Sequence, residues 1–270
     1  MSVSAPTRIT PSGRMTELRA QRIWERNYLV YRRIWKVIFS GFFEPVFYLL
    51  SIGVGIGALV GDITLPGGHV VSYTAFVAPA LMATSAMNGA VMETTFNIFF
   101  KLKFGNVYQG ILTTPMQPMD IAVGEIGWAL FRGSLYTSVF LAVMAVMGLV
   151  ESSWWSLLVI PGAVLIGFAF GSVGLAACTF MRSWQDFDLV SLATMPLFLF
   201  SATFYPIDVY PPALQIAVMF SPLYHGTELL RSLTLGIFDL SLVGHVAFLV
   251  VMGLIGATVA SRRLDGLLRK

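Results

Sequence analysis

The chain is poor in cysteine, histidine and charge. Its 270 residues include one cysteine, Cys178, and three histidines. A single cysteine excludes an internal disulfide, and the histidines lack the spacing of zinc ligands, so no metal site is predicted. Charged residues make up 11% of the chain and hydrophobic residues 56%, whereas a soluble domain carries about 25% charged residues. The composition is that of an integral membrane protein.

Several motifs are absent as well. The chain has no G-x-x-x-x-G-K-[ST] loop, so it is not expected to bind ATP by that route. It has no G-x-S-x-G elbow, which leaves a Ser-His-acid hydrolase unsupported, and no catalytic residue is predicted. Seven arginines and no early apolar run occupy the first 33 residues. This pattern does not match a signal peptide, and we expect the first span to direct insertion.

Apolar runs predict the fold class. A spanning helix needs about 20 apolar residues, and backbone inside a bilayer must satisfy its own hydrogen bonds. The sequence therefore predicts an all-α membrane protein with six transmembrane helices between residues 37 and 262. Residues 1–14 are expected to be a disordered tail, and residues 263–270 a second tail. The six predicted spans cover residues 37–60, 72–100, 121–150, 154–181, 189–204 and 242–260.

Basic residues predict the orientation. When six spans are threaded, fifteen of the seventeen lysines and arginines fall on one side. Such an excess marks the cytoplasmic side of a membrane protein, which explains the net charge of +3 better than nucleic-acid binding does. Both termini are therefore expected on the cytoplasmic side of the cytoplasmic membrane.

Residues 15–36 read as an amphipathic helix. Ala20, Trp24, Tyr28, Tyr31 and Trp35 recur at helical spacing, and arginines occupy other positions around the helix. This pattern favours a helix lying in the membrane interface, with its arginines at anionic headgroups. An ordinary cytoplasmic helix packed on protein is the alternative.

Four ionisable residues fall inside or at the ends of spans: Glu44, Glu93, Glu125 and Arg132. A charge at the bilayer centre costs about 2.5–3.5 kcal/mol, so these groups should pair or face a cavity. Glu125 and Arg132 are seven residues apart, share one helix face, and are candidates to bridge neighbouring helices. Two interpretations stay open, namely ion pairs that fix helix register and a charged cavity that contacts substrate.

Prolines interrupt the chain after the fifth predicted span. The apolar run 213–220 is too short to cross a bilayer. It suggests a re-entrant hairpin on the outer side, lining or covering a pathway. His225, Glu228 and Arg231, spaced three apart, line one helical face there, and a solvated or capped face is the alternative; His69 and His245 look isolated. The candidate outer gate comprises Pro206, Pro211, Pro212, Pro222, His225, Glu228 and Arg231.

A compact loop, 101–119, separates the second and third spans. Its glycines bracket one short amphipathic turn, which prolines end. With an exposed tyrosine and leucine, this turn is a candidate docking surface for a cytoplasmic partner. Its residues are Gly105, Val107, Tyr108, Gln109, Gly110, Ile111 and Leu112.

Two stretches resemble a known family. One runs from residue 93 to 135 and carries Glu93, L-T-T-P at 112–115, and Gly124, Glu125, Trp128 and Arg132. The other, FLFSATFYPID followed by PLYHGTELLRSLTLG, has Ala202 where the family usually has glycine. Together they resemble ABC-2 type exporter permeases, especially the nodulation lipo-oligosaccharide exporters and, further off, daunorubicin-resistance permeases. The likeness extends from about residue 20 to the end.

The resemblance implies roles for these segments. Residues 15–35 become a connecting helix, 105–113 a coupling helix seated in an ATP-binding subunit, and 206–231 the outer hairpin. The ATPase, with its ATP and Mg²⁺, would be a separate chain, and six spans would be half a pore, so a second permease chain should pair with this one. No cofactor is expected in this chain itself, and lipids are its remaining partners.

The favoured function is export of an amphipathic molecule, either a glycolipid, a lipo-oligosaccharide or a hydrophobic drug. The alternatives are a multidrug or antibiotic-resistance exporter, a membrane-embedded lipid-modifying enzyme, and a structural scaffold. Only the face of His225, Glu228 and Arg231 offers the enzyme reading any acid or base. A scaffold would leave the broken hairpin unexplained.

Overall fold

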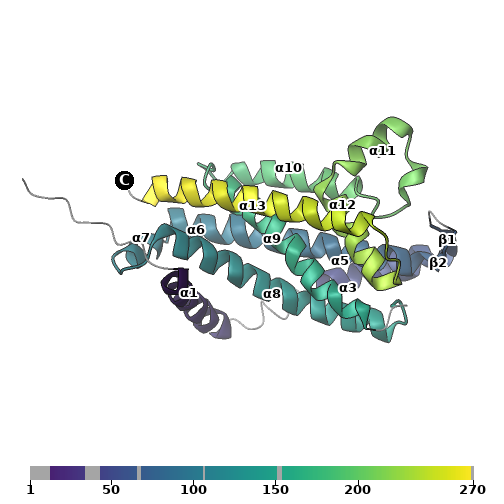
Figure 1. The fold of residues 1–270 in the computed structure, drawn as a ribbon, viewed down its shortest axis with the longest axis horizontal. Helices are drawn as coiled ribbons and strands as arrows, with labels where there is room; N and C mark the ends of the chain where they lie inside the picture. The colour runs from purple at the N-terminus through teal and green to yellow at the C-terminus, as the bar shows by residue number, and fades with distance from the viewer. Residues whose placement is uncertain (1–12, 34–42, 66–67, 106, 151–153, 269–270) are drawn as a thin grey trace, which may run out of the picture.

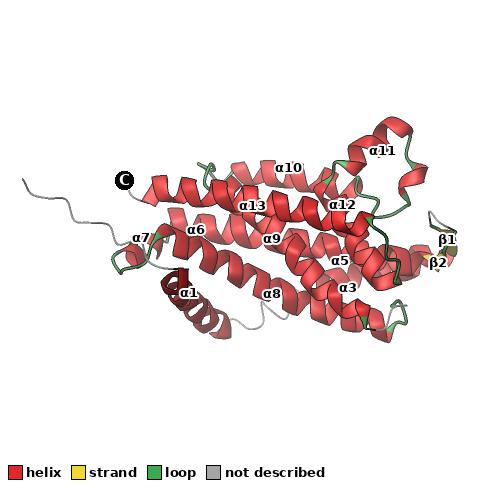
Figure 2. Ribbon diagram, in the orientation of Figure 1, coloured by secondary structure: helices red, strands yellow, loops and turns green. Residues whose placement is uncertain are grey.

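A computed structural model describes residues 13–33, 43–65, 68–105, 107–150 and 154–268. Figures 1 and 2 show an elongated bundle of helices with one short pair of strands at one end. The elements are α1 (Gly13–Arg33), α3 (Phe43–Tyr48), the π-helical segment η1 (Leu49–Ile56), α4 (Gly57–Val60), β1 (Asp62–Thr64), β2 (Val70–Ser72), α5 (Tyr73–Met92), the π-helical segment η2 (Glu93–Asn97), α6 (Ile98–Lys103), α7 (Val107–Leu112), α8 (Pro118–Val146), the 3₁₀ turn η3 (Trp155–Leu158), α9 (Val159–Cys178), α10 (Asp186–Leu199), the 3₁₀ turn η4 (Ile207–Val209), α11 (Pro212–Met219), α12 (Pro222–Leu235) and α13 (Ser241–Leu268).

Four helical stretches among the described residues are long and apolar enough to cross a membrane: Tyr73–Lys103, Pro118–Val146, Trp155–Cys178 and Ser241–Leu267. They correspond to the second, third, fourth and sixth predicted spans. A shorter apolar helix, Pro45–Val60, covers most of the first predicted span, whose opening residues 37–42 lie outside the described part. The chain is thus a predominantly helical, multi-pass membrane protein.

The fifth predicted span is shorter than expected. α10 has 14 residues and ends at Leu199, not at residue 204. Phe200 leaves helical geometry, and Ala202 is the one non-glycine residue with positive φ, 52°, in the described chain. The sequence analysis also missed the antiparallel pair β1–β2, in which Ile63 is opposite Val71. Ser72 then caps α5 by accepting a hydrogen bond from the Ala75 amide at 3.2 Å.

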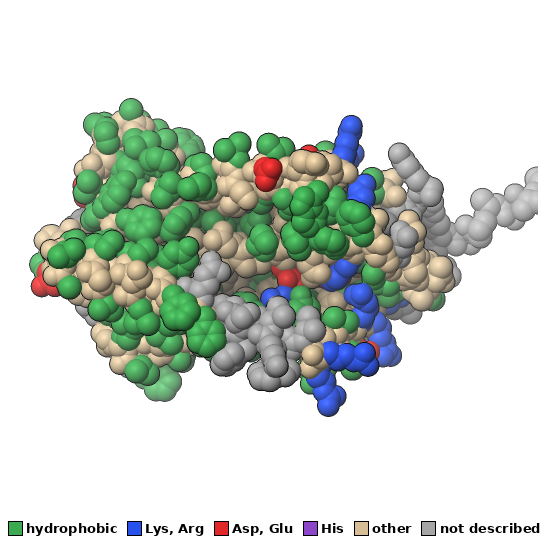
Figure 3. Space-filling model, turned by 180° about the vertical axis from the view of Figure 1, so that it is seen from behind, with side chains coloured by type: hydrophobic (Ala, Val, Ile, Leu, Met, Phe, Trp, Pro, Cys, Tyr) green, Lys and Arg blue, Asp and Glu red, His purple; other side chains and the backbone are tan. Residues whose placement is uncertain are grey.

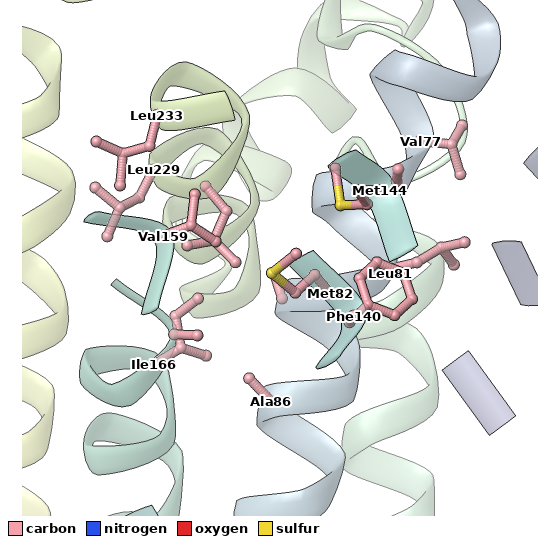
Figure 4. Packing of buried hydrophobic residues seen from close by; sticks show 14 of the residues in the cluster. Val77, Leu81, Met82, Ala86, Phe140, Met144, Val159, Ile166, Leu229 and Leu233 are labelled. Atoms are coloured by element: carbon pink, nitrogen blue, oxygen red, sulfur yellow. The ribbon is translucent and has the colours of Figure 1, made fainter. Parts of the chain in front are cut away.

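The main core lies where α5, α8, α9 and α12 meet. Figure 4 shows Met82 and Phe140 side by side, with Ile166 and Leu229 facing them from α9 and α12. All four side chains are buried. Burying such a side chain contributes about 1.5–3 kcal/mol in a soluble protein, but between helices in lipid the gain comes from close packing.

The helix predicted at 15–36 is α1, which already includes Gly13 and Arg14; residues 34–36 lie outside the described chain. α1 packs across α8, and two glycines of α8 permit the close approach. A Cβ on Gly124 would lie 2.6 Å from the Ile23 Cβ, and one on Gly127 would lie 2.9 Å from the Trp24 Nε1. Tyr28 faces outward. α1 therefore has one face on protein and one exposed apolar face.

Basic side chains gather at one end of the bundle, the end that carries α7 and the C-terminus (Figures 1 and 3). We call it the basic end. Along the rest of the visible face, hydrophobic side chains predominate (Figure 3). This is the distribution that a lipid-embedded surface requires.

Candidate functional site: a buried polar network

Glu125 is the centre of a hydrogen-bonded cluster near the basic end. Its side chain is 2% exposed, and Lys101 Nζ lies 2.9 Å and 2.8 Å from its two carboxylate oxygens. The Tyr108 hydroxyl donates to Oε1 at 3.1 Å, and Asn27 Nδ2 donates to Oε2 at 3.2 Å. A buried carboxylate needs such a full set of partners, because burying an unpaired carboxylate costs several kcal/mol.

Arg132, two turns further along α8, forms a second cluster. Its Nη1 is paired with the Glu93 carboxylate and donates to the Tyr31 hydroxyl at 2.7 Å. Its Nη2 donates to the Tyr136 hydroxyl at 3.0 Å. Tyr31 in turn donates to Glu93 at 3.1 Å, and burial, followed by the Glu93 charge, raises the pKa of Tyr31 above its ordinary value.

The two clusters show how Glu125 and Arg132 bridge neighbouring helices, as the sequence suggested. Glu125 and Arg132 share a face of α8, as predicted, but they do not pair with each other among the described contacts. Each instead pairs with an oppositely charged residue of the preceding helical stretch, Lys101 or Glu93. Two carboxylates are thereby balanced by two cations, which keeps this buried region neutral.

Local backbone geometry helps to place Glu93. It opens η2, the π-helical segment within the stretch from α5 to α6. Such insertions into α-helices are frequent at functional sites, because they rotate the following side chains relative to the preceding ones. Asn97, one turn on, donates to Glu93 at 2.6 Å and fixes the carboxylate.

A small cavity adjoins the second cluster. Its volume is about 40 Å³, and Ser85, Glu93, Arg132 and Tyr136 contribute to its lining. One water molecule needs a cavity volume of about 10–15 Å³, so this cavity has room for more than one water. Arg132 Nε is buried and has no hydrogen-bond partner among the described residues. The charges therefore pair, as one interpretation of the sequence proposed, and a polar cavity lies beside one pair, while contact of these charges with a substrate stays a prediction.

The predicted docking turn is α7, and Tyr108 does not lie on its outer surface. Tyr108 is 1% exposed and points inward to Glu125, so the expectation of an exposed tyrosine is wrong. Three residues of α7 are half-buried and pack against the hydrophobic cluster that includes Ile121, namely Val107, Ile111 and Leu112. Gly105, Gln109 and Gly110 are exposed. The hydrogen bond from Tyr108 to Glu125 therefore fixes α7 to the bundle, a contact that sequence spacing did not reveal.

At the opposite end, Arg231 is buried, so the alternative of a solvated face is wrong for it. Its Nη1 pairs with Glu228, its Nη2 donates to the Ala202 carbonyl at 2.8 Å, and its Nε donates to the Phe76 carbonyl at 3.3 Å. The guanidinium also lies 3.8 Å from the centre of the Phe76 ring. Arg231 therefore ties α12 to α5 and to the irregular turn after α10.

His225 and His245 form a pair that the sequence did not predict. Their Nδ1 atoms are 2.7 Å apart, one on α12 and one on α13, so His245 is not isolated. The Phe248 ring stacks on His225 with centroids 4.0 Å apart. Within the described residues no cluster of three or more His, Cys, Asp or Glu side chains is placed to hold a metal ion.

The prolines define the breaks around α11. Pro206 precedes η4, Pro211 precedes α11, and Pro212 and Pro222 are the first residues of α11 and α12. At the first helical position the missing N–H of proline leaves no bond unmade. The side chain of Glu44, the remaining predicted site residue, lies outside the described part of the chain.

A multi-pass bundle with charged pairs buried between its helices is typical of membrane transport proteins, because such charges are retained inside a membrane for function. The chain matches the family described as ABC-2 type transporter over residues 19–235. It belongs to that family and is a membrane-spanning subunit of such a transporter.

Several proteins similar to this chain share the same name. Nodulation protein J of Rhizobium leguminosarum bv. trifolii is 32% identical over 90% of this chain and 92% of its own length. Nodulation protein J of Rhizobium leguminosarum bv. viciae is 32% identical over 90% of this chain and 93% of its own. Nodulation protein J of Rhizobium meliloti (strain 1021) is 31% identical over 79% of this chain and 80% of its own length.

Proposed function

We propose that this chain is the permease subunit of an exporter that moves an amphipathic glycolipid or lipo-oligosaccharide outward across the cytoplasmic membrane. It pairs with a second permease chain and with a separate ATP-binding subunit, which holds ATP and Mg²⁺. The likeness to proteins named for nodulation supports the choice of cargo, together with the resemblance drawn from the sequence motifs. Six spans, with Pro45–Val60 completing the first and α10 serving as the fifth, are part of this proposal.

One observation carries the proposed mechanism. α7 at the basic end is hydrogen-bonded through Tyr108 to Glu125, and Glu125 is bonded to Lys101 of α6 and Asn27 of α1. A displacement of α7 therefore acts on three other helices through one buried carboxylate. Closure of ATP-bound partner subunits against α7 would move α1, α6 and α8 together. The outer end opens when α12, fixed by Arg231, shifts relative to α5.

The geometry gives the enzyme alternative no support. Glu228 and Arg231 are paired with each other, and two further nitrogens of Arg231 are bound to backbone carbonyls. A general acid or base must reach a substrate with its own polar atoms. These side chains instead hold the outer end of the bundle together.

The proposed partner is tested by purifying the tagged chain from its native membrane in mild detergent. An ATP-binding protein in stoichiometric amount, with vanadate-sensitive ATP hydrolysis, is the expected result. A chain that purifies alone and inert would contradict the proposal.

A bulky side chain on α7 should block docking without disturbing the fold. A Cβ on Gly110 would meet no atom within 4 Å, so Gly110→Trp obstructs only the outer surface. We expect recovery of the ATPase partner to fall about tenfold, which corresponds to about 1.4 kcal/mol, at an unchanged melting temperature. Ile111→Glu should lower both, because Ile111 is half-buried.

Gly244→Trp is the matched control. Gly244 also has open space around its Cβ but lies at the start of α13, away from the basic end. This variant should retain the partner at the wild-type level. If Gly110→Trp retains it equally well, α7 is not the docking element.

A cysteine at Asp208 tests the orientation. Asp208 is exposed in η4, so Asp208→Cys should react with a membrane-impermeant maleimide from the outside of intact cells. Thr113→Cys, exposed beside α7, should react only after the membrane is opened. The native Cys178 is 1% exposed and contributes little background. Labelling of position 208 from the cytoplasmic side alone would reverse the proposed topology.

A further inference from the structure

A long apolar groove separates α10 from the rest of the bundle. Its volume is about 770 Å³, within the roughly 300–1,000 Å³ of small-molecule sites. Val173 and Ala177 line it from α9, Phe180 from the turn that follows α9, and Val190, Ala193 and Leu197 from α10. α10 has no buried residue, so this helix stands off from the bundle instead of packing tightly onto it.

The end of the groove near the basic end is polar and carries charges of both signs. Arg182, Ser183 and Asp186 lie there. The backbone amides of Arg182 and Ser183 donate to the Asp186 carboxylate at 2.6 Å and 3.1 Å. Arg263 places its guanidinium 4.2 Å from the Phe180 ring centre. The mouth therefore carries Arg182 and an amide-bound carboxylate, with a second guanidinium stacked on Phe180 beside it, which suits a polar headgroup.

The length of the groove matches one leaflet. From Asp186 at the mouth to Leu197 is eleven residues along α10, or about 16 Å at 1.5 Å per residue. Half of a hydrocarbon core of about 30 Å is nearly the same. An acyl chain with its head at the mouth would extend to the middle of the bilayer.

The far end of the groove reaches the outer hairpin. Pro222, the first residue of α12, lies in its wall, and the neighbouring Ser221 hydroxyl is 2.6 Å from that of Ser201. A chain that fills the groove thus touches the helix whose Arg231 holds the outer end together. Filling of the groove and opening of the outer end would therefore both act on α12.

We propose that this groove holds the acyl chain of the transported amphiphile, loaded from the cytoplasmic leaflet with its polar head beside Arg182. The inference rests on the proposed function, since it takes the cargo and the orientation from it. It adds the position of the lipid tail, which neither the family nor the sequence motifs specify. The tail lies within one chain, between α9 and α10, and not between two chains.

The test uses the complex of this chain with its ATPase in vesicles of phosphatidylethanolamine and phosphatidylglycerol. The probe is an N-acylated oligosaccharide with a diazirine at the middle of its acyl chain. Illumination should label peptides of α9 and α10. Ala177→Trp and Ala193→Trp fill the groove from opposite walls, at positions exposed enough to accept the ring, and each should lower labelling about tenfold or more.

Ala142→Trp is the matched control, since Ala142 is an exposed alanine of α8 that does not line the groove. It should label as the wild type does. Arg182→Gln should weaken competition by the unlabelled acylated oligosaccharide, and Arg182→Lys should restore it in part. The melting temperature of each variant shows whether it is folded.

Three results would overturn the inference. Labelling confined to other helices, while the wild type still exports the probe, would move the tail elsewhere and leave the proposed function intact. Competition by phosphatidylglycerol as strong as by the acylated oligosaccharide would make the groove a phospholipid site. A disulfide between two chains carrying Ala193→Cys would place a second copy there. Absence of ATP-dependent export by the wild type would instead count against the proposed function itself.

Discussion

Glu125→Gln is expected to lower the free energy of unfolding by about 3 kcal/mol, because it leaves the buried ammonium of Lys101 without its partner. At roughly 2–4 °C per kcal/mol for a chain of this size, the melting temperature should fall by about 6–12 °C. Tryptophan fluorescence during thermal unfolding in detergent measures the change. Glutamine has the shape of glutamate, so the loss reports on charge and not on packing.

A second substitution identifies the partner. In Glu125→Gln with Lys101→Met, no unpaired charge remains, and a buried ion pair replaced by groups of similar volume is often neutral in stability. The double variant should therefore regain most of the loss. Combination with Arg132→Met should be additive within about 0.5 kcal/mol. A strong coupling between Glu125 and Arg132 would contradict the pairing described here.

Arg231→Lys is expected to destabilise the chain by at least about 2 kcal/mol, although the charge is retained. Lysine has a single ammonium group, which cannot reproduce the planar fork that bonds Glu228 and the carbonyls of Phe76 and Ala202. A buried carbonyl left without its donor costs about 1–3 kcal/mol. Thermal unfolding again measures the effect.

The chain supplies a matched control for this change. Arg22 also pairs with a glutamate three residues away, Glu25, but both side chains are more than half exposed. Exposed pairs contribute about 0–1 kcal/mol, so Arg22→Lys should change stability by less than about 0.5 kcal/mol. Equal effects of Arg22→Lys and Arg231→Lys would mean that burial of Arg231 is not what fixes α12.

Both predictions concern the same physical problem, a charge held in a region of low polarity. In the cluster around Glu125 the charge is met by side chains of three other helices, α1, α6 and α7. In the cluster around Arg231 it is met largely by backbone carbonyls, because α10 ends early and the turn at Ala202 directs its carbonyl inward. The first cluster contacts α7 through Tyr108, and the second ties α12 to α5 at the opposite end of the bundle.

Several parts of the fold followed from the sequence. Apolar length predicted the second, third and fourth spans to within four residues at each end. It also predicted the start of the sixth, whose helical stretch continues seven residues beyond the predicted end, to Leu267. The position of α7 between Gly105 and Pro115 was also predicted. These features are local, since each depends on residues that are neighbours along the chain.

The partners of the charged groups did not follow from the sequence. Glu125 and Arg132 were recognised as a shared face, but Lys101 was assigned to a loop, and Tyr31 and Tyr108 were read as interfacial or exposed. The sequence indicated that each buried carboxylate needs a partner of opposite charge. It did not indicate which lysine or arginine would lie beside it. The pairing of His225 with His245 had no signal in spacing, since twenty residues separate them.

By itself the sequence determined that this protein is a multi-pass helical membrane protein with a break before its last span. Hydropathy and proline act within a single segment, where the bilayer alone sets the rule. Only the tertiary structure decided which charges meet, that Tyr108 and Arg231 point inward, and that α10 stands apart to leave a groove. Those outcomes depend on how whole helices pack, because each contact joins residues that are distant in sequence and meet only after the helices assemble.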